Sequence, residues 1–518
     1  MKRNRRYVVA LGLALMVCGA AESFAGTKHY GNSEKLNTRP SLTVSWEAWK
    51  AQWPLVASDF TKVSLTPGVN ETELNFAWLT PAERDGKASV RFGTDLSEMK
   101  EFTGTAEDVD PALTNGAKYR ANKVTVTGLK PHTTYYYTVD GRETKAYTTA
   151  DFDTVRFLYV GDPQIGASKG QMQGDVKLAP ASGAENTAAR NDAFGWERTL
   201  NIAVEQNPDL NFVFSAGDQV NKTGKPKEEE YAGFLNPKVF ERLPLATTIG
   251  NHDSLNLDYR HHFNTPNMSE LGTTVAGGDY WFSYGDALFI VLNTNNYNAA
   301  EHEEAIKKAL ASHADAAWRI VSMHQDIYGS GLDHSDSDGM ILRTQLTPLF
   351  DKYDVDVVLQ GHDHTYSRSK MLYGDGKIHG KYAFSLNEKG DDYDWKHAIN
   401  TETKAKIALD PKDDADKKAL EAFRKDNACY VIEDVQGNKV VNPKGTLYIE
   451  TNSASGSKYY ELVPTQQDYI AVRSQNWLPS YSVVTVTRDC FSIDTWQVTD
   501  EGKAEKIDET FSIVKSAQ

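Results

Sequence analysis

Six residues of types that bind metal ions each follow a short apolar segment of this 518-residue sequence. The segments read FLYVGD, NFVFSAGD, LATTIGNHD, WRIVSMH and VDVVLQGHDH, and all but WRIVSMH include a glycine just before the polar residues. The six residues are Asp162, Asp218, Asn251, His324, His362 and His364. Mixed oxygen and nitrogen donors suit zinc, manganese or iron rather than calcium or a thiolate-bound metal. Two such ions about 3.5–4 Å apart can activate water for attack on phosphorus.

The apolar segments predict the elements that would position these side chains. A short apolar run that stops at glycine is typical of a buried β-strand, and glycine permits a sharp exit from the strand. Ligand sites of α/β sheets lie beyond the carboxyl ends of their strands. We therefore expect five strand ends to deliver the six residues to one position, where a carboxylate can bridge two cations.

The first strand end leaves two interpretations open. The stretch FLYVGDPQIG places Asp162 and Gln164 two residues apart, so that both can point to the same side beyond the strand. Gly-Asp-Pro is also ordinary turn chemistry. A single Gly-Asn-His-Asp segment is likewise more often structural than functional. Only the ordered recurrence of the pattern favours a metal site.

The chain consists of two regions that differ in their predicted secondary structure. Residues 60–150 contain about seven short strand-like segments between Gly, Pro and Asn turns, which predicts a small β-sandwich; VTGLKPHTTYYYTV resembles a fibronectin type III-like domain. Residues 154–515 alternate strands with helices, which predicts an α/β domain. The charged residues 388–428 read as an insertion, with a helix within 409–426. Further helices are expected at Asp192–Gln206, Ala300–Ala311 and Ile341–Asp351.

The N-terminus predicts export. MKRNRR is a basic segment, YVVALGLALMVCGAA is apolar and SFA offers a cleavage site, so residues 1–25 read as a signal peptide. We expect a periplasmic or extracellular protein without a transmembrane segment in the mature chain. The formal charge of −15 disfavours nucleic-acid binding. Cys429 and Cys490 either pair in an oxidising compartment or remain separate buried thiols.

Taken in order, the motifs resemble those of the calcineurin-like metallophosphoesterases, and within them the purple acid phosphatases. The family motifs run D-x-G or D-x-H, G-D-x-x-Y, G-N-H-D/E, V-x-x-H and G-H-x-H, and this sequence has GDPQ, GDQVN, GNHD, VSMH and GHDHTYSR. The resemblance covers roughly residues 63–513 apart from the insertion. It implies an N-terminal β-sandwich followed by an α/β/β/α sandwich, in which two mixed sheets are flanked by helices.

The resemblance also implies which residues hold the two metal ions, divalent or mixed-valence. The first ion would be held by Asp162, Asp218 and His364. Asp218 would bridge to the second ion, and the remaining ligands of that ion would be Asn251, His324 and His362.

Further roles are implied around the metal ions. His252 would be the general acid or a transition-state donor, and Asp253 would orient it. The segment HQDIYGSGLDH resembles the family's substrate loop, so His334 would contact the phosphate. Tyr366, which follows the last motif, and Asn221, which follows the second, would line the substrate site.

Two positions depart from the family pattern. Asn221 stands where the acid phosphatases have a ligand tyrosine, and Gln164 stands where the wider superfamily often has histidine. An amide oxygen holds a borderline metal more weakly than imidazole does. Gln164 is therefore predicted either to bind the first metal through its oxygen or to hydrogen-bond a metal-bound water, and the second role is favoured.

The sequence thus predicts an exported two-metal enzyme that hydrolyses phosphate monoesters with metal-activated water. A phosphodiesterase or a nucleotide-hydrolysing enzyme is the alternative within the class, because one scaffold supports all three reactions. A surface binding protein with an inactive phosphoesterase domain is the alternative from another class. In such a protein we would expect metal-ligand residues to be replaced, whereas this sequence has all six ligand candidates.

Overall fold

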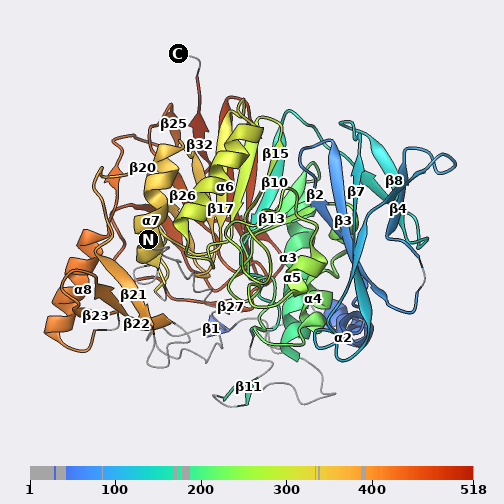
Figure 1. Ribbon diagram of the computed structural model, residues 1–518, viewed down its shortest axis with the longest axis horizontal. Helices are drawn as coiled ribbons and strands as arrows, with labels where there is room; N and C mark the ends of the chain where they lie inside the picture. The colour runs from blue at the N-terminus through green and yellow to red at the C-terminus, as the bar shows by residue number, and fades with distance from the viewer. Residues whose placement is uncertain are drawn as a thin grey trace, which may run out of the picture.

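The computed structural model describes residues 29–30, 43–84, 86–168, 172–173, 176–177, 187–332, 334–335, 339–386, 393–409 and 411–516. An N-terminal β-sandwich packs beside a larger domain built on two sheets (Figure 1). The predicted signal peptide lies outside the described residues. Within those ranges, no helix combines the length and the apolar character needed to cross a membrane.

The N-terminal region folds as the predicted β-sandwich, which in the described residues consists of two four-stranded antiparallel sheets. Successive side chains along a strand point to opposite faces of its sheet. In β8, for example, the buried residues are Tyr135, Tyr137 and Val139, and the residues between them are not buried. The first sheet runs in the order β2 (Ser64–Pro67), β3 (Glu73–Pro81), β7 (Tyr119–Thr127) and β6 (Thr105–Asp108). The second runs in the order β5 (Lys100–Thr103), β4 (Ser89–Gly93), β8 (Thr134–Val139) and β9 (Lys145–Thr148).

The first sheet of the α/β domain is mixed and, in the described part of the chain, has eight strands. β10, β13 and β14 are parallel neighbours, and β29 joins β10 in the antiparallel sense. The order is β14 (Leu245–Thr247), β13 (Phe212–Ser215), β10 (Val155–Val160), β29 (Ser480–Thr487), β30 (Cys490–Val498), β32 (Phe511–Val514) and β25 (Lys439–Val441), with β31 (Ala504–Lys506) on β30.

The second sheet is also mixed, with seven strands among the described residues. Its central strands β16, β17, β18 and β26 are parallel. The order is β15 (Tyr280–Tyr284), β16 (Ala287–Leu292), β17 (Trp318–Met323), β18 (Val357–Gln360), β26 (Leu447–Glu450), β19 (Tyr366–Ser369) and β28 (Ile470–Ser474).

The two sheets pack face to face, and helices cover their outer faces, which confirms the predicted α/β/β/α sandwich (Figure 1). Phe157 and Phe212 of the first sheet meet Phe289 of the second edge-on, at 5.5 and 5.6 Å between ring centroids. The helices over the first sheet are α2 (Thr43–Ala57), α3 (Thr187–Gln206) and α4 (Glu228–Phe234), and those over the second are α6 (Ala299–Ser312) and α7 (Gly339–Lys352). α3, α6 and α7 confirm the three helices predicted from periodicity.

The predicted charged insertion has its own secondary structure. The helix expected within residues 409–426 is α8 (Asp414–Asp426), whose first turn is capped by Asp413. Leu420 and Phe423 of α8 pack on Ile341 of α7. The neighbouring strands are β20 (Leu372–Tyr373), β21 (Tyr382–Leu386), β22 (Tyr393–Asn400), β23 (Lys406–Ala408) and β24 (Val431–Ile432).

The remaining elements are short. They are β1 (His29–Tyr30), β11 (Met172–Gln173), β12 (Val176–Lys177), the 3₁₀-helix η2 (Lys238–Glu241), α5 (Asp258–His262) and β27 (Lys458–Tyr459). β1 pairs with β27, far from it in sequence. Of the two interpretations of the cysteines, the structure has Cys429 and Cys490 as free thiols.

Candidate metal centre

The predicted ligands lie beyond the carboxyl ends of five strands, at the edge where the two sheets meet. β10, β13 and β14 end there in the first sheet, and β17 and β18 end there in the second. Parallel pairing within each sheet aligns those ends. The residues that follow the five strands are Asp162, Asp218, Asn251, His324, His362 and His364.

The two sheets touch directly at this edge through their backbones. Gly161 forms a parallel bridge with Ser453, and the backbone nitrogen of Ala454 donates to the Gly161 oxygen at 2.8 Å. A Cβ at Gly161 would lie 2.8 Å from the oxygen of Thr451, so only glycine permits this approach. The glycine at the end of β10 therefore has a packing role next to Asp162.

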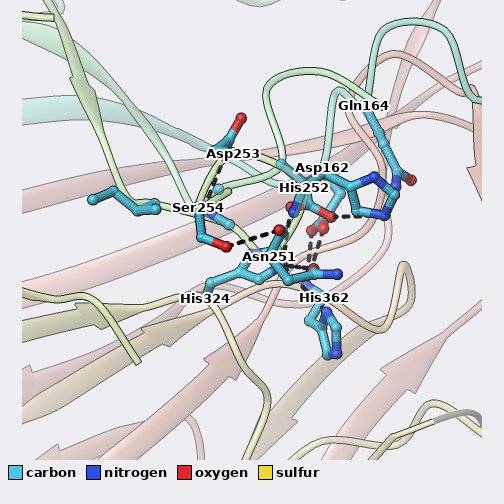
Figure 2. Close-up of polar contacts among 12 residues, drawn as sticks. Asp162, Gln164, Asn251, His252, Asp253, Ser254, His324 and His362 are labelled. Atoms are coloured by element: carbon cyan, nitrogen blue, oxygen red, sulfur yellow. Dashed lines mark hydrogen bonds and ion pairs between the residues drawn. The ribbon is translucent and has the colours of Figure 1, made fainter. Parts of the chain in front are cut away.

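Asp218, His324 and His362 form a group of metal-competent side chains at the predicted site. One donor atom from each lies within 4.8 Å of the others. His324 Nε2 is 3.4 Å from Asp218 Oδ1, 3.2 Å from His362 Nδ1 and 3.0 Å from Asn251 Oδ1 (Figure 2). His324 Nδ1 lies 3.0 Å from the Ala216 oxygen and donates to it, which leaves the lone pair on Nε2 facing the group.

Asp162 and His364 lie beside this group. The Asp162 carboxylate accepts hydrogen bonds from the backbone nitrogen of His362 at 2.9 and 3.1 Å. His364 Nε2 is 3.5 Å from Asp162 Oδ1, and its Nδ1 donates to the backbone oxygen of Lys458 at 2.7 Å. His324 and His364, whose Nδ1 atoms donate to backbone oxygens, thus turn Nε2 toward a carboxylate.

The electrostatics fit a bound cation. Burial raises the pKa of Asp162 to about 7. Burial also opposes ionisation of Asp218, but the charges of His324 and His252 hold its pKa below the usual range. Burial is the main cause that places the pKa of His362 and of His364 well below the ordinary value, which keeps these imidazoles neutral. Burial opposes protonation of His324, but Asp218 and Asp162 raise the pKa of this imidazole to about 9. Two buried carboxylates beside the neutral imidazoles of His362 and His364 are donors that suit a divalent metal.

Five of the predicted site residues have left-handed backbones. A non-glycine residue in this region costs of order 1–3 kcal/mol, and such residues concentrate at functional sites. The φ angles are 43° at Asp162, 39° at Gln164, 50° at Asp218, 78° at His362 and 47° at His364. These backbone conformations turn the chain sharply at the strand ends, where the proposed ligands lie.

His252 lies at the rim of the group, with one fifth of its side chain exposed. Its Nδ1 hydrogen-bonds the backbone oxygen of Asn221, and its Nε2 is 3.9 Å from Asp218 Oδ2 and 2.9 Å from Gln164 Nε2. Gln164 Oε1 is buried and has no hydrogen-bond partner within the described ranges. This orphaned acceptor fits a metal ion or its water, so the metal-directed role of Gln164 stays a prediction.

The predicted pairing of Asp253 with His252 is wrong. The Asp253 carboxylate accepts from the backbone nitrogens of Gly250, at 3.0 Å, and Gln219, at 3.3 Å, and from the Tyr231 hydroxyl at 3.3 Å. Figure 2 shows the Asp253 side chain directed away from the His252 ring. Asp253 is fully buried and braces the turn beneath the site, while the carbonyl of Asn221 orients the imidazole.

The ring of His334 lies beside the proposed ligand His362, and its contact with phosphate stays a prediction. Its ring centroid is 4.0 Å from that of His362 and 6.2 Å from that of Tyr460. The neighbouring Ser335 hydroxyl bonds both Asp326 and Asp363, which ties this loop to the segment that carries His362.

The predicted substrate contact of Tyr366 is wrong. Its side chain is 1% exposed and lies in the core between the two sheets. Its hydroxyl donates to Asp508 at 2.7 Å, and Arg368 donates to the same carboxylate at 2.7 Å. Tyr366 begins β19, and the strand directs its side chain inward, away from the metal-binding edge.

A sixth strand end also contributes to the site. β26 is parallel to β18 and is followed by TNSASGSKYY, which places Lys458 and Tyr460 beside His364. The segment GTLYIE before it is also a short apolar strand, but its glycine precedes the strand instead of following it. Sequence reasoning also missed Lys227, a buried residue whose ammonium donates to the backbone oxygen of His252 at 2.9 Å.

Comparisons with known proteins agree with this architecture. The family model for calcineurin-like phosphoesterases matches residues 155–366, and the model for the purple acid phosphatase N-terminal domain matches residues 60–154. Together they match the β-sandwich and the first part of the α/β domain, up to residue 366.

Proteins with similar sequences include purple acid phosphatases. An uncharacterized protein of Mycobacterium tuberculosis is 24% identical over 58% of this chain and 60% of its own length. Purple acid phosphatase 15 of Arabidopsis thaliana is 24% identical over 60% of this chain and 64% of its own. The chain thus spans less than two thirds of these curated relatives.

The fold is also shared with solved structures. A purple acid phosphatase from yellow lupin (Lupinus luteus) superposes with a TM-score of 0.57 and 15% identity, over 88% of this chain and 75% of the other. The two family models identify residues 155–366 as a calcineurin-like phosphoesterase domain that follows a purple acid phosphatase N-terminal domain at residues 60–154, and the solved structure shares this fold.

Proposed function

We propose that this protein is a two-metal phosphoesterase that hydrolyses phosphate monoesters. The observation that carries the proposal is the convergence of Asp218, His324 and His362 within 4.8 Å, with Asp162 and His364 alongside. Family membership and the kept ligand set support catalysis over an inactive scaffold.

Two zinc, manganese or iron ions would be held by this chain's own side chains. Asp218 is proposed to bridge the two ions, because its carboxylate faces His324 at 3.4 Å and its charge acts on Asp162 of the other half of the set. When bound, the ions would supply Lewis-acid activation of water and neutralise charge on the phosphoryl oxygens. The proposed ligands are Asp162, Asp218, Asn251, His324, His362 and His364.

His252 is the proposed general acid. Its Nε2 faces the group from a partly exposed position, where a leaving-group oxygen could reach it. A proton held at Nε2 would pass to the leaving alkoxide, while the Asn221 carbonyl holds Nδ1 in place. His334, stacked against His362, would contact the phosphoryl group from the opposite loop.

Residues 1–25 are proposed to be a signal peptide that exports the protein to the periplasm or beyond. The basic and apolar segments and the SFA cleavage site support this proposal. N-terminal sequencing of protein from the host's extracytoplasmic fraction tests it, and an intact Met1 there would contradict it.

The activity is tested by metal analysis combined with paired substrates. We expect purified protein to contain two transition-metal ions per chain and to hydrolyse p-nitrophenyl phosphate faster than bis(p-nitrophenyl) phosphate. The reverse order would indicate the phosphodiesterase alternative, and protein without metal or turnover would indicate an inactive scaffold.

A variant at His252 tests the assignment of the acid. His252→Asn should keep both metals while kcat falls by about 10²–10⁴-fold, the usual contribution of a positioned acid. His397→Asn, at a histidine of the insertion that pairs with Asp394, is the control and should leave kcat unchanged. Loss of metal in His252→Asn would make His252 a ligand instead.

A further inference from the structure

Lys458 brings a positive charge to the wall of the metal centre in a chain whose formal charge is −15. The residue is 9% exposed and starts β27, just after the strand end of β26. An anionic substrate approaching such an acidic chain depends on local cations, because the overall field repels it.

The contacts of Lys458 tie it to the proposed ligands and to the substrate loop. Its backbone oxygen accepts the Nδ1 proton of His364, and its ammonium lies 5.0 Å from the ring centroid of Tyr460. The Tyr460 ring meets His364 edge-on at 5.2 Å and His334 at 6.2 Å. Lys458, Tyr460, His364 and His334 therefore form one continuous wall.

The backbone around Lys458 is held from its other side. Tyr30 of β1 pairs with Lys458, and His29 pairs with Tyr459. His29 also stacks on Trp477 at 3.7 Å between ring centroids, and its Nε2 is 3.5 Å from Glu461 Oε1. A segment near the N-terminus thus closes the edge of the short strand that positions the lysine.

We propose that Lys458 is a specificity-determining residue that selects doubly charged phosphoryl groups over singly charged ones. This inference rests on the proposed phosphoesterase function and adds to it a residue that discriminates by charge. A phosphate monoester carries about −1.5 to −2 at neutral pH, whereas a diester carries one negative charge. A buried ammonium, a compact point charge, favours the substrate with the extra charge.

The test compares two esters and two inhibitors with the metal-loaded enzyme. In Lys458→Met we expect kcat/KM for p-nitrophenyl phosphate to fall by about 10- to 100-fold, the range of a hydrogen bond to a charged group. The value for bis(p-nitrophenyl) phosphate should change by less than about 3-fold. Inhibition by inorganic phosphate should weaken in parallel, while inhibition by dimethyl phosphate should not. Lys458→Arg should stay within about 3-fold of the wild type on both esters, because it keeps the charge.

Lys444→Met is the matched control, since Lys444 also lies over a tyrosine ring, 4.4 Å from the centroid of Tyr373, but is exposed. It should not alter the ester preference. Metal content and the circular dichroism spectrum should be unchanged in all three variants. Equal losses on both esters, or no loss on either, would overturn the selective role of Lys458. A wild type that hydrolyses neither ester would refute the proposed function, and weakened phosphate binding in Lys458→Met would still report on the charge contact.

Discussion

The Nε2 atom of Gln164 lies 2.9 Å from the Nε2 atom of His252. One of the two nitrogens must donate, and the proton on Nδ1 of His252 is already directed at the Asn221 oxygen. The Gln164 amide therefore donates to a neutral His252. A half-turn of the amide would present Oε1 to a protonated His252, so one side chain can serve both states of the acid.

Replacing Gln164 by leucine should reduce kcat by about 2- to 10-fold, the contribution of one neutral hydrogen bond. The same change made in His252→Asn should have little further effect, because the two residues act through one contact. Steady-state kinetics of the four proteins measure this coupling. Loss of metal in Gln164→Leu would point to the alternative, direct ligation through Oε1.

Asp218→Asn should lower the occupancy of both metal sites together, because Asp218 is the proposed bridge between the two ions and its Oδ1 faces His324. Elemental analysis after purification measures the metal content. Asp279→Asn, at an equally buried aspartate that bonds His302, is the control and should retain both ions. Normal metal content with normal turnover in Asp218→Asn would contradict the bridging assignment.

Tyr366→Phe should destabilise the protein by about 1 kcal/mol and leave KM unchanged. The reason is its buried hydrogen bond to Asp508, which holds β19 against the C-terminal segment between the sheets. Urea unfolding followed by fluorescence measures the free energy of unfolding. A raised KM with unchanged stability would restore the substrate contact that the structure contradicts.

The pair of His302 and Asp279 should make stability depend on pH. Burial opposes protonation of His302, but the hydrogen bonds to Asp279, at 2.7 Å, and to the Asn296 oxygen, at 2.7 Å, outweigh it and raise the pKa of the imidazole. The stabilisation of the fold by protonated His302 is therefore fully present below about pH 6.5, the pKa of histidine in the unfolded chain. It is lost as pH rises through the raised pKa of the folded state.

His302→Gln should accordingly lower the free energy of unfolding more at pH 6 than at pH 9, as urea titrations at both values would show. His313 offers a control of opposite sign, because burial lowers its pKa. A lowered pKa favours the neutral imidazole, so any stabilisation from His313 is present above about pH 6.5 and shrinks as pH falls. His313→Gln should therefore not lower the free energy of unfolding more at pH 6 than at pH 9. Equal losses at both pH values in His302→Gln would mean that the pair acts as a neutral hydrogen bond.

Local sequence determined the elements and the ligand types of this protein. Short apolar runs can satisfy their backbones only as buried strands, and periodic apolar faces require helices, so β10, β13, β17, β18 and α3 were predictable one by one. The recurrence of Asp, Asn and His after these runs defined a donor set before any contact was known. The resemblance to a known family then supplied the order of the layers.

Only the tertiary structure decided what each residue touches. A period of two along a strand does not say which side faces the metal edge, and the pairing of β19 turns Tyr366 into the core. Adjacency in sequence suggested that Asp253 orients His252, but the turn after Gly250 aims the two side chains apart. Lys458 comes to the centre because β26 packs parallel to β18, a pairing between segments about ninety residues apart that no local pattern encodes.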